Sequence, residues 1–171
     1  MRVPVCIIAA AVGVAAAAFP AAAEQPDPLA ARLVDPEGTV VTLGGALGPQ
    51  PLVVNLWATW CTPCIAELPA LAALDQWLRP RGGQVLLVAA EPGDPALINR
   101  ALHDRFGVTT LDSHVDRAGL VTAALGIRAF PATVVLGRDG AVLELIIGAE
   151  DWDDPAVRAR LAAWLQPEQA R

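Results

Sequence analysis

Short apolar runs of strand length recur along the chain and are separated by polar turns. The runs at 52–57 and 85–89 are apolar almost throughout, as expected for strands covered on both faces of a sheet. Other runs pair across tight turns containing Asp, Pro or Gly and predict hairpins, and a Gly/Pro-rich loop is predicted at 44–51. The predicted strands lie at 32–34, 39–43, 52–57, 85–89, 111–115, 133–136 and 142–147.

Helical spacing fills most of the intervals between these strands. It is clearest over 65–78, where apolar residues recur every three or four positions, and Pro69 inside this run predicts a kink. Asp94-Pro95 and Asp154-Pro155 are typical cap and first-turn pairs and predict the starts of two more helices. Another helix is predicted at 117–125. This order predicts an α/β fold, with a central mixed β-sheet flanked by helices and an N-terminal β-hairpin extension.

The first residues have the composition of an export signal. Arg2 is the only charged residue before Glu24, an Ala-rich apolar run follows it, and Ala21 and Ala23 form a small-x-small site. We therefore expect a signal peptide at 1–23, with an uncleaved membrane anchor as the alternative, and a periplasmic location. The rest is predicted as a flexible leader at 24–30, one domain at 31–166 and a C-terminal tail at 167–171.

The charge balance argues against one class of partner. The chain has 12 basic residues, all of them arginine, against 18 acidic residues, and its net charge is −6. Basic clusters are absent from the sequence, so nucleic acid is not an expected partner. The acidic run at 150–154 lacks the loop spacing of a calcium site, and we interpret it as solvated surface in which Asp153 or Asp154 caps the last helix. No cofactor is expected.

Three cysteines occur in the chain: Cys6 in the predicted signal peptide, and Cys61 and Cys64 in a CxxC motif. A bridge between the last two closes too small a loop to add much stability, so in an oxidising compartment the motif is typical of redox chemistry. Zinc is the alternative ligand, but a structural zinc site needs four ligands, and neither His103 nor His114 has ligand spacing. No metal is therefore expected.

The CxxC motif lies where a predicted strand meets a predicted helix. At a helix N-terminus, unpaired backbone N–H groups and the helix dipole stabilise a thiolate, so Cys61 is expected to be an exposed, activated nucleophile. Cys64 lies one turn further on and deeper, and we expect it to resolve the mixed disulfide that Cys61 forms with a partner. Pro63 in the first turn removes no helical hydrogen bond and stiffens this turn.

Two segments about seventy residues apart carry a family resemblance. Residues 52–69, which include Trp-Ala-Thr-Trp-Cys-Thr-Pro-Cys, resemble the active-site stretch of the thioredoxin superfamily and are most similar to its TlpA/ResA-like periplasmic thiol–disulfide oxidoreductases. Residues 126–133 resemble the cis-proline loop of the same family. The resemblance covers about 31–166 and implies a thioredoxin-like fold.

The resemblance also implies roles for single residues. It implies a cis peptide bond between Phe130 and Pro131, opposite the two cysteines. It implies a partly buried Glu67 with a raised pKa that moves protons to or from Cys64, whereas the alternative is an exposed helix acid. Asn55 occupies the position of a buried aspartate in cytoplasmic thioredoxins, and the amide cannot act as a base. The expected substrate-binding residues are Trp60, Thr62, Pro63, Phe130 and Pro131.

The expected activity is that of a protein-disulfide reductase. The resemblance implies exported proteins with thiols or disulfides as substrates, cytochrome c maturation as one setting, and a membrane electron donor that reduces the pair again. We expect a monomer. An oxidase or isomerase and a non-enzymatic copper-handling thiol protein are the alternatives. A peroxidase is disfavoured, because the peroxiredoxin pattern requires Thr three residues before the attacking Cys, whereas Thr59 is two before Cys61.

Overall fold

The structure is a computed structural model that describes residues 27–47, 52–137 and 139–165. The predicted signal peptide at 1–23, residues 24–26 of the predicted leader and the predicted tail at 167–171 lie outside the described residues. The rest of the predicted leader is structured. Pro28–Ala30 form a 3-10 turn (η1) that Asp27 caps, and the partly buried Leu29 packs on the apolar cluster beneath the sheet.

A seven-stranded mixed sheet forms the centre of the molecule, in the order β2-β1-β5-β4-β3-β6-β7. β3, β4 and β5 run parallel, whereas β1, β6 and β7 pair antiparallel with their neighbours. The strands are β1 (Arg32–Val34), β2 (Val40–Thr42), β3 (Leu52–Trp57), β4 (Gln84–Ala89), β5 (Ser113–Val115), β6 (Ala132–Leu136) and β7 (Val142–Ile147). The predicted mixed sheet, its two hairpins and the two buried central strands are confirmed.

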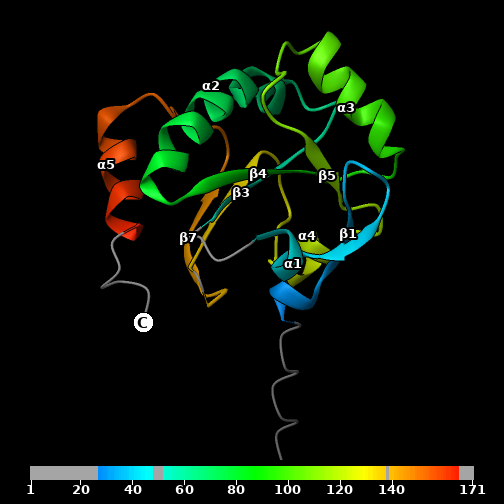
Figure 1. Cartoon of the computed structure of the whole chain (residues 1–171), viewed down its shortest axis with the longest axis horizontal. Helices are drawn as coiled ribbons and strands as arrows, with labels where there is room; N and C mark the ends of the chain where they lie inside the picture. The colour runs from blue at the N-terminus through cyan, green and yellow to red at the C-terminus, as the bar shows by residue number, and fades with distance from the viewer. Residues whose placement is uncertain (1–26, 48–51, 138, 166–171) are drawn as a thin grey trace, which may run out of the picture.

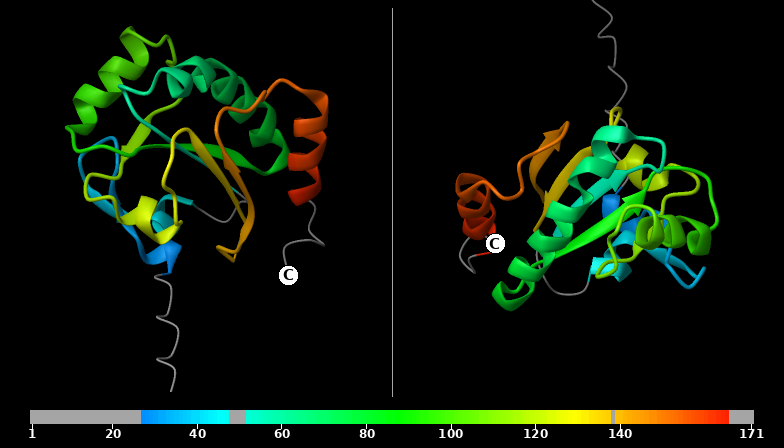
Figure 2. Two further views of the ribbon diagram at one scale, coloured as in Figure 1. Left: turned by 180° about the vertical axis from the view of Figure 1, so that it is seen from behind. Right: turned by 90° about the horizontal axis from the view of Figure 1, so that it is seen from above.

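Helices cover both faces of this sheet, as Figures 1 and 2 show. The long α2 (Thr62–Leu78), together with α3 (Pro95–Asp104) and α5 (Pro155–Trp164), packs on one face over a cluster that includes both cysteines. The shorter α1 (Leu43–Leu47) and α4 (Leu120–Ala124) lie on the other face over a second cluster. Both faces of the central strands are therefore covered, which explains their uninterrupted apolar sequence.

The helix starts follow the sequence signals. Asp94 and Asp154 each accept a hydrogen bond from the backbone N–H two residues later, and a proline occupies the first turn of α3 and of α5. Pro69 lies inside α2, which continues through it to Leu78. A short 3-10 turn, η2 (Arg79–Arg81), follows, and Gly82 ends it at a φ of +80°, a conformation that glycine adopts without steric cost.

Two predicted elements differ from the structure. The predicted loop at 44–51 contains α1 instead, because Leu43 and Leu47 lie one turn apart and are both buried against the sheet. The helix predicted at 117–125 begins only after Gly119, whose φ of +70° lies outside the helical region. Within the described residues, no helix has the length and apolar character needed to cross a membrane.

Candidate active site

The two cysteines lie at the junction of β3 and α2. β3 ends at Trp57, a turn follows in which the Cys61 N–H donates to the Ala58 carbonyl at 3.1 Å, and α2 begins at Thr62 with Cys61 as its N-cap residue. Cys61 and Cys64 form a disulfide, with their Cα atoms 5.3 Å apart. The predicted pair is therefore adjacent in space and oxidised in this structure.

The exposure of the pair differs from the prediction in one respect. Cys64 is completely buried, as expected, but Cys61 is only 6% exposed, although the sequence predicts an exposed residue. The reason is the bridge itself, which holds the Cys61 sulfur against an enclosed partner in the main apolar cluster. The pair remains asymmetric, because Cys61 is the cysteine with residual exposure.

The surroundings of Cys61 combine a helix start with exposed side chains. Cys61 precedes a 17-residue helix whose first N–H groups have no intrahelical acceptor, and this environment stabilises a thiolate at that position. Thr62 and Pro63, which follow it, are both exposed. Trp60, which precedes it, is 65% exposed, so it lies at the rim and not in the core, whereas Trp57 is fully buried and donates from Nε1 to Ser113.

The cis-proline loop reaches the same edge of the sheet. The Phe130–Pro131 peptide bond is cis, which confirms the expectation. Phe130 is half-buried, and its ring contacts the ring of Trp60 edge-on, with centroids 6.2 Å apart. Pro131 is buried. The structure thus brings Phe130 beside Trp60, and the binding of substrate by this group of residues stays a prediction.

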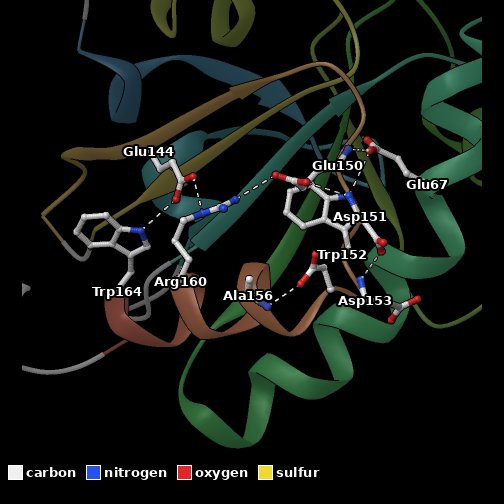
Figure 3. Close-up of polar contacts among 10 residues, drawn as sticks. Glu67, Glu144, Glu150, Asp151, Trp152, Asp153, Ala156, Arg160 and Trp164 are labelled. Carbon is white, nitrogen blue, oxygen red and sulfur yellow. Dashed lines mark hydrogen bonds and ion pairs between the residues drawn. The ribbon is translucent and has the colours of Figure 1, made fainter.

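Glu67 lies one helical turn after Cys64 on α2 and is 6% exposed, so the alternative of an exposed helix acid is wrong. Its carboxylate accepts three hydrogen bonds. Asn55 Nδ2 donates to Oε1 at 2.8 Å, whereas Trp152 Nε1 and the Glu150 N–H donate to Oε2 at 3.2 and 3.4 Å. Residues from β3, α2 and the segment before α5 therefore meet at one carboxylate. Figure 3 shows Glu67 with Glu150 and Trp152 of that segment.

Burial raises the pKa of Glu67 above its ordinary value of 4.5. The hydrogen bonds from Asn55, Trp152 and the Glu150 N–H favour the carboxylate and oppose this rise, but they do not cancel it. A carboxyl group whose pKa is raised toward neutrality exchanges protons more readily near pH 7. The predicted direction of the shift is confirmed.

Asn55 connects this carboxylate to the sheet. Besides Glu67, its Nδ2 donates to Thr133 Oγ1 at 2.9 Å, across the β3–β6 pairing. Its Oδ1 is buried and has no hydrogen-bond partner among the described residues. The amide therefore acts as a donor to Glu67, and the ionisable group here is Glu67 itself.

The acidic run at 150–154 is only partly the solvated surface that the sequence predicts. Asp151, Asp153 and Asp154 are exposed, and Asp154 caps α5. Trp152, however, is completely buried at Glu67, and Glu150 accepts from Arg160, which also pairs with Glu144 of β7 (Figure 3). Four of these five residues are acidic, and the fifth, Trp152, is the buried one. The only sequence signal for this burial is the aromatic side chain itself.

The sequence prediction did not include a second carboxylate, which binds the loop that leads to Cys61. Glu91 follows β4, and it accepts two hydrogen bonds from Thr59, which lies two residues before Cys61. The available signal is positional, because Glu91 lies two residues after the end of a buried parallel strand, and the carboxyl ends of such strands meet at one edge of the sheet.

Metal ligands do not gather in the described part of the chain. No group of three or more His, Cys, Asp or Glu side chains is placed to hold an ion there. His103 pairs with Asp112 at 3.0 Å, and His114 lies half-buried in β5, where burial lowers its pKa.

Comparisons with known proteins agree with this geometry. The chain is 32% identical over 101 residues to the thiol-disulfide oxidoreductase ResA of Geobacillus thermodenitrificans, a match that covers 59% of this chain and 56% of that protein. The match thus spans little more than half the length of this relative.

Solved structures show the same fold. The exposed lipoprotein thioredoxin Etrx1 of Streptococcus pneumoniae superposes with a TM-score of 0.62 at 19% identity, covering 77% of this chain and 96% of that one. A secreted disulfide oxidoreductase of Mycobacterium tuberculosis, homologous to E. coli DsbE, gives a TM-score of 0.62 at 19% identity, covering 82% and 97%. The fold is therefore thioredoxin-like, as the resemblance implies.

The family assignment rests on a match that covers most of the chain. The family model described as Redoxin matches residues 15–161, which include the cysteine pair, Glu67 and the cis-proline loop. The chain belongs to the Redoxin family.

Proposed function

We propose that this protein is a thiol–disulfide oxidoreductase that reduces disulfides of exported proteins through Cys61 and Cys64. The observation that carries the proposal is the disulfide at the start of α2, in which Cys64 is completely buried and Cys61 keeps a small exposed fraction. Family membership and the similarity to ResA support the same chemistry.

The first step uses the reduced protein. The thiolate of Cys61 attacks one sulfur of a substrate disulfide, the substrate S–S bond breaks, and a mixed disulfide forms between Cys61 and the substrate. The substrate sulfur that leaves as a thiolate takes up a proton. The exposed Trp60, Thr62 and Pro63 adjoin Cys61 in the chain, and the ring of Phe130 contacts that of Trp60. In the proposed reaction these four residues contact the substrate chain.

The second step releases the substrate. The Cys64 thiol loses its proton, and its sulfur attacks the Cys61 sulfur, so that the Cys61–Cys64 disulfide forms and the second substrate thiolate leaves. The substrate gains two electrons and the protein loses two. Glu67 lies one turn from Cys64 in the same enclosed region, and its carboxylate accepts the proton from Cys64.

The setting that fits this chemistry is the periplasm. The composition of residues 1–23 and the secreted structural relative support export. A membrane electron donor then reduces the Cys61–Cys64 disulfide after each turnover, and the thiols of apocytochrome c are a substrate class for a reductase of this kind.

The reduction of insulin disulfides tests the proposal. We expect the wild-type chain to accelerate insulin reduction by dithiothreitol, and Cys61→Ser to lower the rate to that of dithiothreitol alone, because the attacking sulfur is gone. Cys64→Ser is expected to accumulate a mixed disulfide at Cys61, visible on non-reducing gels.

Cys6→Ser is the matched control, made in the unprocessed chain that retains Cys6; because Cys6 lies outside the motif, this variant is expected to retain the wild-type rate. Full activity of Cys61→Ser would contradict the proposal. Equal trapping of substrate by Cys61→Ser and Cys64→Ser would contradict the division of roles between the two cysteines.

A further inference from the structure

Both carboxylate oxygens of Glu91 accept hydrogen bonds from a single residue of the loop that leads to Cys61. Oε1 accepts from the Thr59 backbone N–H at 2.8 Å, and Oε2 accepts from the Thr59 hydroxyl at 3.1 Å. Among the described residues, no arginine or histidine lies within ion-pair distance of Glu91. The charge of this carboxylate is therefore directed at Thr59, and the proposed mechanism does not use it.

The Thr59 contact is part of a larger attachment between the end of β4 and this loop. The Ala90 N–H donates to the Trp57 carbonyl at 2.8 Å and extends the parallel β3–β4 pairing by one step. Glu91 then holds Thr59, and the Cys61 N–H closes the turn on Ala58. The position of Cys61 at the start of α2 is thus set from the β4 side.

The Glu91 carboxylate binds the residue two positions before Cys61, which limits how far its charge can lie from the Cys61 backbone. Two residues of extended chain span at most about 7 Å, and Glu91 Oε1 lies 2.8 Å from the Thr59 nitrogen. The negative charge is therefore within roughly a Debye length, about 10 Å, of the Cys61 backbone. A nearby negative charge disfavours a thiolate. A less stable thiolate makes the reduced pair a stronger reductant, because the reduced form is then less stable relative to the disulfide.

We propose that Glu91 is a positioning residue of the Cys61–Cys64 pair. It fixes the loop before Cys61 through Thr59, and its charge makes the reduced pair a stronger reductant. This inference rests on the proposed function, in which the Cys61 thiolate attacks the substrate. Glu91 itself touches neither substrate nor sulfur in this account and acts through Thr59.

The experiment compares Glu91→Gln with the wild-type chain by two readouts. One is the pH profile of Cys61 alkylation in the reduced protein, and the other is the equilibrium of the pair with a glutathione redox buffer. The glutamine side chain removes the charge and presents an NH₂ group to one of the Thr59 donors. We expect the alkylation midpoint to move to lower pH and the equilibrium to shift toward the dithiol by about threefold or more.

Two Thr59 variants separate positioning from folding. Thr59→Ser keeps both donors and is expected to retain the wild-type pH profile. Thr59→Val removes the hydroxyl donor and leaves the charge, so it is expected to slow disulfide exchange while moving the midpoint less than Glu91→Gln. Asp35→Asn is the matched control, because Asp35 also accepts from a threonine N–H, at 2.7 Å, but in the β1–β2 turn.

The outcomes distinguish this inference from the proposed function. A wild-type chain that labels Cys61 and Cys64 equally would overturn the proposed function. A wild-type chain that labels Cys61 selectively, together with an unchanged midpoint and equilibrium in Glu91→Gln, would overturn the role of Glu91 alone. If Glu91→Gln does not fold, the two Thr59 variants test the role of Glu91. Identical disulfide-exchange rates for Thr59→Val and Thr59→Ser would then overturn that role.

Discussion

The carboxyl group of Glu67 is enclosed by donors from two parts of the chain, β3 and the segment before α5, so its charge is linked to folding. Asn55, Trp152 and the Glu150 N–H all donate to it, and none of them takes a proton from it. The sequence and the family resemblance predict its burial and the direction of its pKa shift. They do not predict Trp152 as a partner, because that contact joins residues 85 positions apart.

The stability of Glu67→Gln is expected to depend less on pH than that of the wild-type protein. Since burial raises the pKa of Glu67 above 4.5, the folded protein binds more protons than the unfolded chain between 4.5 and the folded-state pKa. The free energy of unfolding of the wild type, relative to the variant, therefore falls as pH rises through this window. Urea unfolding of both oxidised proteins from about pH 4 to about pH 8 measures the difference. Parallel pH curves would contradict the burial of a titrating carboxyl group here.

Trp152→Phe is expected to remove one donor from Glu67 and keep the buried ring. The loss should raise the pKa of Glu67 further, because the hydrogen bond from Trp152 lowers it. It should also cost about 1.5–3 kcal/mol of stability where Glu67 is ionised, as for a hydrogen bond to a charged group. Denaturant unfolding and an NMR titration of the Glu67 carboxyl carbon check both effects.

Trp164→Phe is the matched control for this variant. Trp164 Nε1 also donates to a glutamate, Glu144, at the same distance of 3.2 Å, but at a partly exposed site. We expect a smaller loss of stability and no change in the Glu67 titration. Equal effects of the two substitutions would contradict the buried network at Glu67.

At the scale of elements, α2 is fixed to the sheet at both ends by polar contacts. Its start is set by the Cys61 turn, and near its end the buried Asp75 accepts from the Val85 N–H at 2.9 Å, at the beginning of β4. The sequence predicts α2 and β4 from their apolar spacing, because that signal is local. It does not predict which polar side chain connects them, and it does not predict α1, whose two buried leucines stand among glycines.

Asp75→Ala is expected to lower the free energy of unfolding by about 1–3 kcal/mol, since the Val85 N–H would be buried without an acceptor. Arg79→Ala is the control. Arg79 pairs with Asp75 from an exposed position, so its removal is expected to cost about 1 kcal/mol or less. Urea unfolding measures the free energy of unfolding of both variants. A larger loss in Arg79→Ala than in Asp75→Ala would contradict the attachment of α2 to β4 through Asp75.

At the scale of the whole molecule, the fold gathers the chemistry at one edge of the sheet. The carboxyl ends of β3 and β4 lead to Cys61 and Glu91, and the cis-proline loop enters β6 beside them, so that Phe130 meets Trp60. The sequence predicts this meeting only through the family resemblance, since about seventy residues separate the two motifs. The limited exposure of Cys61 was not predictable, because it depends on the closed disulfide.

The proposed thiol–disulfide exchange depends most on the unequal reactivity of the two thiols, and alkylation of the reduced protein measures this difference directly. Labelling with iodoacetamide across a pH series, with mass spectrometry to assign each site, is expected to show Cys61 reacting first, at pH values below the ordinary thiol pKa of about 8.5, and Cys64 protected. Slow and indistinguishable labelling of Cys61 and Cys64 across the series would contradict the account.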